Sequence, residues 1–168
     1  MLIRTEQPGD RPTVLKLVAR AFATGDGTEP VEPRLLAELY DCDGFLPEFS
    51  LVAEDEETVV GHVISTRGWI DGAPALGLGP IAVEPERQRS GIGAALLAET
   101  RQRAEAAAES VILLLGSTHY YPRFGYRPAS ESGIKAPDPA WGAHFMALPL
   151  TALPPTGTFT YAGPFGRL

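Results

Sequence analysis

Apolar residues near the N-terminus recur at three- and four-residue intervals, the spacing of a helix with one buried face. This pattern predicts a helix over residues 11–22, with Asp10 as its N-cap and Pro12 in its first turn, and a shorter helix over 34–40. Residues 24–33, between the two helices, are rich in glycine, proline and acidic side chains and are predicted to form a loop.

Beyond residue 49 the pattern changes to short apolar runs bounded by turn residues, which is typical of strands. Turn signals at Glu54–Glu57 and Asp71-Gly72 predict an antiparallel meander, and the apolar run Val111–Leu115 predicts a strand buried on both faces. An alanine-rich helix is expected over 91–108 and a helical turn over 118–124. The predicted strands are 2–5, 50–53, 58–66, 76–83, 111–115, one near Tyr126, and 145–150. This order predicts an α+β domain with a central, mixed but mostly antiparallel β-sheet flanked by helices.

Length and charge narrow the class of protein. The chain has 168 residues, of which 44% are hydrophobic, and this is enough for one domain with one core. Its net charge of −7 argues against binding to nucleic acid or to an anionic membrane surface. No apolar stretch is long enough to cross a bilayer and the N-terminus has no apolar signal segment, so a cytoplasmic location is expected.

Cysteine and histidine positions give no support to disulfide or metal chemistry. Cys42 is the only cysteine, which excludes an intrachain disulfide and a thiolate cluster. His62, His119 and His144 do not share the spacing of metal ligands, so no metal site is expected.

The segment 88–93, with the sequence QRSGIG, lies where a predicted strand gives way to a predicted helix. Glycines at a helix start let a ligand approach the backbone closely, and the first N–H groups of a helix have no partner within it. The helix dipole adds positive charge at this end, beside Arg87 and Arg89. The segment therefore predicts a phosphate or pyrophosphate site. A Walker A loop is excluded because no Gly-Lys-Ser/Thr is present, and G-x-G-x-x-G is excluded because Leu96 follows Gly93 by three positions.

The segments around this loop resemble the GNAT family of N-acetyltransferases. Residues 78–85 (LGPIAVEP) resemble the family's cofactor-binding strand, 88–93 its Q/R-x-x-G-x-G/A pyrophosphate motif, and 120–126 (YYPRFGY) its later element with a Tyr four residues before a Gly–aromatic pair. The hairpin around 45–63 and the tail around 157–165 are similar to the YhbS-like subgroup. The resemblance covers nearly the whole chain. It implies the GNAT (acyl-CoA N-acyltransferase) fold, with a domain over residues 1–150 and a C-terminal tail, 151–168, packed on the same domain.

The resemblance implies acetyl-CoA as the cofactor and acetyl transfer to a primary amine of a small molecule or peptide, by direct attack without a covalent enzyme intermediate. Backbone groups of the strand are expected to pair with pantetheine, and those of the loop and helix start to hold the pyrophosphate. The residues expected to bind the cofactor are Ile81, Ala82, Val83, Gln88, Arg89, Ser90, Gly91, Ile92, Gly93, Ala94, Tyr121 and Phe124. The assembly implied by the family is a homodimer.

Tyr121 occupies the position of the family's general acid, which protonates the departing CoA thiolate, although the tyrosines here also fit an aromatic cluster beneath a short helix. The general base is unassigned. Many relatives carry a Glu on the strand that matches 76–83, and this strand has no carboxylate. His119, next to the tyrosine pair, is the favoured candidate for a second catalytic residue. The other candidates are Glu48, Glu54 and His62.

Two alternative functions remain open at this stage. The missing strand carboxylate favours a non-catalytic acyl-CoA-binding regulatory module. Gly77 and Gly79 leave space for a longer acyl group, unless they mark a β-bulge. Whether the donor carries an acetyl or a longer acyl group, acidic side chains in or near the first loop favour a cationic acceptor. These acids are Asp26, Glu29, Glu32 and Glu38.

Overall fold

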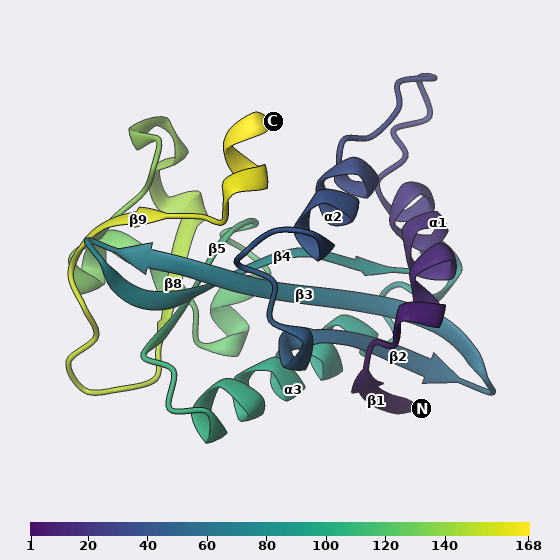
Figure 1. Cartoon of the computed structure of the whole chain (residues 1–168), viewed down its shortest axis with the longest axis horizontal. Helices are drawn as coiled ribbons and strands as arrows, with labels where there is room; N and C mark the ends of the chain where they lie inside the picture. The colour runs from purple at the N-terminus through teal and green to yellow at the C-terminus, as the bar shows by residue number, and fades with distance from the viewer.

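The computed structural model describes all 168 residues and places helices on both faces of one sheet (Figure 1). Helices α1 (Arg11–Ala21) and α2 (Glu32–Tyr40) lie on one side with the C-terminal segment, and α3 (Ile92–Ala106) lies on the other. The strands are β1 (Leu2–Thr5), β2 (Ser50–Asp55), β3 (Thr58–Ile70), β4 (Ala73–Val83), β5 (Val111–Leu115), β6 (Arg127–Pro128), β7 (Ile134–Lys135), β8 (Phe145–Pro149) and β9 (Gly157–Thr160). The predicted α+β class is confirmed. None of the helices has the length and apolar character of a membrane span.

The sheet has the order β1-β2-β3-β4-β5-β8-β6, and its neighbours are antiparallel except for β4 and β5. These two central strands run parallel and pair only at Leu76↔Ile112 and Gly77↔Leu113. β4 then continues to Val83 with β3 as its partner along one edge. The other edge of β4 beyond Leu78 therefore has no strand partner, and its backbone groups are free to bind something else.

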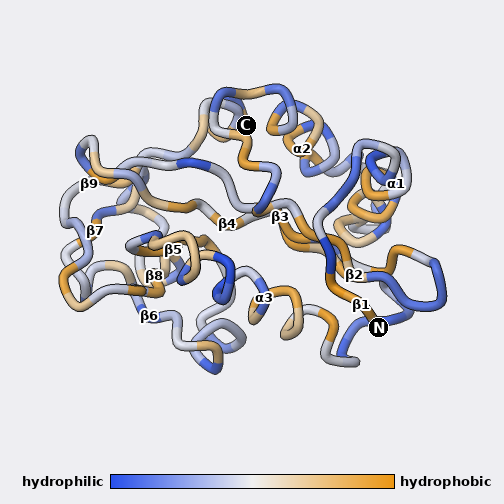
Figure 2. Tube along the Cα trace, turned by 60° about the horizontal axis from the view of Figure 1, so that its bottom comes forward, coloured by the Kyte–Doolittle hydropathy of each residue, from blue (hydrophilic) through white to orange (hydrophobic).

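Hydrophobic residues concentrate along β3 and β4, which run between the two helical layers in Figure 2. On the α3 face, Leu96 and Leu97 pack against residues of the sheet such as Leu76 and Ile112. On the other face, residues of α1 and α2 form a second buried cluster with Val52 and Ala82. Both faces of the central strands are covered, which explains why their apolar positions do not alternate with polar ones.

The meander strands are longer than predicted. β3 runs to Ile70 and β4 starts at Ala73, because Asp71 and Gly72 both adopt positive φ, 44° and 87°, and close a two-residue turn. Likewise, α2 starts at Glu32 and not at residue 34, since Pro33 is accommodated in its first turn, where a helix tolerates proline.

Residues 151–168 contribute a strand that the apolar pattern does not predict. β9 pairs with the end of β3 through Trp69↔Thr160 and Ile70↔Phe159, and it also pairs with β7. Phe159 is buried in a cluster with Ile70 and Phe145. A four-residue strand held by non-local partners leaves little signal in its own sequence.

Candidate active site

A groove of about 670 Å³, here called the cofactor groove, lies between the end of β4 and the start of α3. Its lining is Ile81, Ala82, Val83, Gln88, Arg89, Gly91, Ile92, Gly93, Ala94, Tyr120, Tyr121, Arg123 and Phe124. Every residue predicted to bind the cofactor is in this lining except Ser90, whose hydroxyl donates a hydrogen bond to the carbonyl of Arg87. The structure therefore brings the predicted strand, loop and tyrosine elements together in one groove.

The backbone of the loop is shaped by Gly91, the N-cap of α3. Its φ of 91° is a conformation that glycine adopts without strain, and no other atom lies within 4 Å of the position where a Cβ would stand. No side chain caps the helix, so the N–H groups of its first turn have no protein partner from a cap. Gly93 is close-packed instead, because a Cβ there would lie 2.9 Å from the hydroxyl oxygen of Tyr120.

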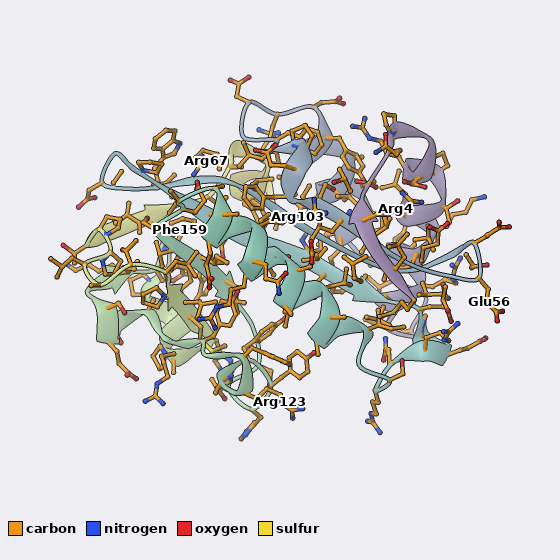
Figure 3. The ribbon with its side chains drawn as sticks, turned by 90° about the horizontal axis from the view of Figure 1, so that it is seen from below. Arg4, Glu56, Arg67, Arg103, Arg123 and Phe159 are labelled. Carbon is orange, nitrogen blue, oxygen red and sulfur yellow. The ribbon has the colours of Figure 1, made fainter.

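The positive charge of the groove comes from Arg89 and Arg123, and its lining contains no carboxylate. Arg123 sits on the short helical turn Tyr121–Phe124 beside α3, at the rim of the molecule in Figure 3, and its guanidinium lies 5.3 Å from the centre of the Tyr120 ring. Arg87 was expected to add charge here, but it forms an ion pair with Asp55 and is outside the lining. Arg89 and Arg123 are therefore the arginines placed to attract an anionic ligand.

A second cavity of about 980 Å³, here called the acceptor pocket, lies on the α1–α2 side of the open edge of β4. Its lining is Phe22, Glu32, Leu35, Leu78, Gly79, Pro80, Ile81, Leu114, Leu115, Tyr121, Pro137, Trp141, Thr158, Phe159, Thr160, Tyr161, Ala162, Gly163, Phe165, Gly166 and Leu168. The wall is mainly aromatic and aliphatic, and Glu32 is its single carboxylate side chain. The C-terminal segment supplies much of this wall.

Ile81 and Tyr121 line both cavities. The ring of Tyr121 packs against Gly116, where a Cβ would collide with it, and its edge contacts the ring of Tyr120 at 5.1 Å between centroids. Burial, reinforced by Tyr120, raises the pKa of Tyr121 to about 12. The phenol therefore keeps its proton at neutral pH, and its residue is common to the walls of both cavities.

The histidines considered as bases lie elsewhere. His119 is exposed and lines neither cavity, so its catalytic role stays a prediction. His62 is fully buried, with Nε2 3.3 Å from Ser50 Oγ and 3.4 Å from Glu6 Oε1. It belongs to a buried polar group with Glu6, to which Tyr40 Oη and Ser50 Oγ each donate at 2.6 Å. This contact set indicates a structural role for His62.

The carboxylates considered as bases are also outside both linings. Glu54 forms an ion pair with Arg4 at 3.1 Å, and Glu48 is exposed. The space beside Gly77 that favoured a longer acyl group is filled, since a Cβ there would lie 2.9 Å from the Tyr161 ring. Gly79 marks a register shift between β3 and β4, with a φ of 138°, so the bulge interpretation holds at this position.

Sequence reasoning missed two features of the site. Arg123 lies inside the YYPRFGY element, whose proline-containing turn was a signal that its arginine shares the site with the tyrosines. The aromatic wall of the acceptor pocket comes partly from Phe159, Tyr161 and Phe165. Aromatic residues clustered in a glycine- and proline-rich tail were the available signal, but their contacts are set by the pairing of β9.

Comparison with known proteins agrees with this geometry. Residues 47–128 match the family model described as an acetyltransferase (GNAT) domain. The chain is 35% identical over 157 residues to the uncharacterized N-acetyltransferase YjhQ of Escherichia coli K12, covering 89% of this chain and 84% of that protein.

Solved structures give the same result. A GNAT family acetyltransferase from Brucella melitensis, in complex with acetyl-CoA, superposes with a TM-score of 0.80 at 30% identity and covers 98% of this chain and 97% of its own. The E. coli N-acetyltransferase YhbS, in complex with CoA, superposes with a TM-score of 0.88 at 27% identity and covers 99% and 92%. The fold is therefore the predicted GNAT fold, and the chain belongs to the GNAT family of N-acetyltransferases.

Proposed function

We propose that this protein binds acetyl-CoA in the cofactor groove and transfers the acetyl group to a primary amine bound in the acceptor pocket. The observation that carries the proposal is the junction of the two cavities at Ile81 and Tyr121. A donor and an acceptor approaching from opposite sides would meet there and nowhere else along the open edge of β4.

The groove fits acetyl-CoA in its chemistry. A pyrophosphate needs N–H donors and positive charge, and the uncapped first turn of α3 with Arg89 and Arg123 supplies both. A pantetheine arm carries amides, and the unpaired edge of β4 from Ile81 to Val83 offers them backbone groups. The acetyl-CoA and CoA complexes of the two solved relatives support this assignment.

The residues at the junction suit acyl transfer by direct attack. When bound, acetyl-CoA supplies a thioester whose carbonyl carbon bonds to the amine nitrogen as its C–S bond breaks; the sulfur gains one proton and the nitrogen loses one. In the proposed reaction a β4 N–H near Ile81 stabilises the negative charge that develops on the carbonyl oxygen, and the presence of Ile81 in both linings supports this role. In the proposed reaction Tyr121 donates the proton that the sulfur receives, and its presence in the walls of both cavities supports this role.

The raised pKa of Tyr121 limits how much it contributes. A phenol with a pKa of about 12 is a weaker acid than a free one near 10, while a thiol has a pKa of about 8.5. Full proton transfer to the thiolate is therefore uphill, and hydrogen bonding to the developing charge has to supply part of the effect. We expect Tyr121 to contribute about 10²-fold, the low end of the range for general acids.

Tyr121→Phe tests the proposal. It removes only the donor, so acetyl-CoA affinity measured by calorimetry stays within about twofold, while kcat for CoA release falls about 100-fold. Tyr126→Phe is the matched control, because Tyr126 contacts the Tyr121 ring at 5.9 Å but lines neither cavity. A wild-type chain that binds acetyl-CoA but acetylates no amine in a broad panel would instead identify a non-catalytic acyl-CoA-binding module.

A further inference from the structure

The acceptor pocket holds one carboxylate side chain in a largely apolar wall. Its lining contains no Lys, Arg, Asp or His side chain, and Glu32 is its single Glu. The aromatic side chains that line the pocket are Phe22, Tyr121, Trp141, Phe159, Tyr161 and Phe165. A carboxylate in such surroundings loses part of its hydration, which is costly unless a positive charge or a donor replaces the water. The wall therefore favours a ligand that brings one positive charge on an apolar body.

Glu32 differs from its acidic neighbours in having a buried carboxylate oxygen without a partner. Its Oε2 is shielded from solvent and has no hydrogen-bond partner in the chain. Asp26 accepts hydrogen bonds from Thr24 and Thr28 at 2.6 and 2.8 Å, and Glu38 lies 3.8 Å from Arg167. Of the acids that favoured a cationic acceptor, only Glu32 lines the pocket and has an unsatisfied oxygen.

The position of Glu32 is fixed by the helix that carries it. Glu32 is the first residue of α2, and Leu35, Leu36 and Leu39 bury the inner face of that helix against the sheet. At the other end of α2, Tyr40 Oη donates to the buried carboxylate of Glu6 at 2.6 Å. A carboxylate held on an anchored helix is better suited to selecting a ligand than one on an exposed loop.

We propose that Glu32 recognises the ammonium form of the acceptor, which releases one proton to bulk water before its neutral nitrogen attacks the thioester, and that the acceptor is a primary amine with an aromatic or similarly bulky apolar body. This inference rests on the proposed function, because it assumes that the acceptor pocket receives the amine. A volume of about 980 Å³ accommodates a ring-bearing amine, and the aromatic wall offers ring faces to both the cation and the apolar body. A polyamine would place several charges against a wall with one carboxylate.

The test compares amines in a steady-state assay of CoA release at saturating acetyl-CoA. The wild-type protein uses 2-phenylethylamine with a kcat/KM at least about tenfold above that for spermidine. The reason is that burying each additional unpaired charge of spermidine in an apolar wall costs more free energy than a tenfold change in kcat/KM represents. Glu32→Gln keeps the size and removes the charge, and it raises KM for 2-phenylethylamine by about tenfold or more with kcat changed much less. For 4-methylaniline, whose amine is uncharged at the assay pH, KM changes less than about twofold.

Glu29→Gln is the matched control, because Glu29 is exposed, lies three positions away and is outside the lining. Calorimetric binding of 2-phenylethylamine in the presence of CoA provides a readout that does not need turnover. If no amine is acetylated but 2-phenylethylamine binds the wild-type protein and not Glu32→Gln, the proposed enzymatic function fails while the role of Glu32 stands. Equal binding and KM in wild type and Glu32→Gln, or a preference for spermidine, would overturn the inference.

Discussion

The two cavities that meet at Ile81 and Tyr121 present different chemical groups to a ligand. The cofactor groove is lined by one stretch of the chain, from the end of β4 through the loop to the start of α3, together with the turn at Tyr120–Phe124. It presents backbone groups and arginines. The acceptor pocket is assembled from both ends of the chain and from β4 and β5, and it presents mainly apolar side chains and one carboxylate side chain. A site built on backbone geometry suits a ligand shared by a whole family, whereas a wall of side chains on loops and tails can vary between members.

The largest expected effect separates backbone geometry from simple loss of stability. Gly91→Glu and Gly72→Glu impose similar strain, because the two glycines have φ of 91° and 87° and open space where a Cβ would stand. Only Gly91→Glu places a carboxylate in the groove, so we expect acetyl-CoA affinity to fall about 100-fold or more in this variant alone. Calorimetric titration measures the affinity, and thermal unfolding shows whether both variants lose similar stability. Equal loss of acetyl-CoA binding in the two variants would mean that binding falls through lost stability and not through a carboxylate placed in the groove.

A smaller effect distinguishes Arg123, which lines the cofactor groove in the structure, from Arg87, which the sequence placed beside the expected phosphate site. Arg123→Ala removes an exposed charge from the groove, and we expect acetyl-CoA affinity to fall about three- to tenfold, with the loss shrinking as salt rises. Arg87→Ala breaks an ion pair with Asp55 outside the groove and should change affinity less than about twofold. Titrations at low and high ionic strength measure both. A larger loss from Arg87→Ala would show that the ion pair opens when the ligand binds.

The smallest expected effect comes from weakening the packing of α2. This helix carries Glu32, which lines the acceptor pocket and not the cofactor groove, so only the affinity for the amine should change. Burial alone would raise the pKa of Glu6, but hydrogen bonds and charge interaction with His62, together with donation from Ser50 and Tyr40, hold the pKa below its ordinary value. Tyr40→Phe removes one donor and should lower the free energy of unfolding by about 1–2 kcal/mol at pH 7. We expect KM for the amine to rise about twofold, with acetyl-CoA affinity unchanged.

The lowered pKa of Glu6 determines how the stability loss caused by Tyr40→Phe depends on pH. A carboxyl group whose pKa is depressed by folding stabilises the fold fully above its unfolded pKa, about 4.3 for Glu, and this stabilisation is lost as pH falls through the folded pKa. The stability difference between wild type and Tyr40→Phe should therefore be constant between pH 6 and 8 and shrink below about pH 4. Denaturant midpoints across this range measure it. A difference that persists unchanged in acid would show that the hydroxyl acts independently of the Glu6 charge.

The fold and most of the groove were predictable because their signals are local. Apolar spacing located α1, α3 and the meander strands, and the QRSGIG loop marked the helix start where Gly91 adopts its positive φ. The family resemblance is confirmed by the relatives. The roles of Tyr121 and His119 stay predictions, although the structure places Tyr121 at the junction and His119 outside it.

The sequence by itself determined most of the helices and strands, the position of the QRSGIG loop at a helix start and the family resemblance, because each depends on residues close together in the chain. Only the tertiary structure decided that Arg87 is neutralised by Asp55, that Tyr161 fills the space beside Gly77, and that Glu32 lines the same cavity as six aromatic side chains. These features join residues that are far apart in sequence. They depend on how β9 pairs with β3 and how α2 packs on the sheet, and no local pattern encodes either contact.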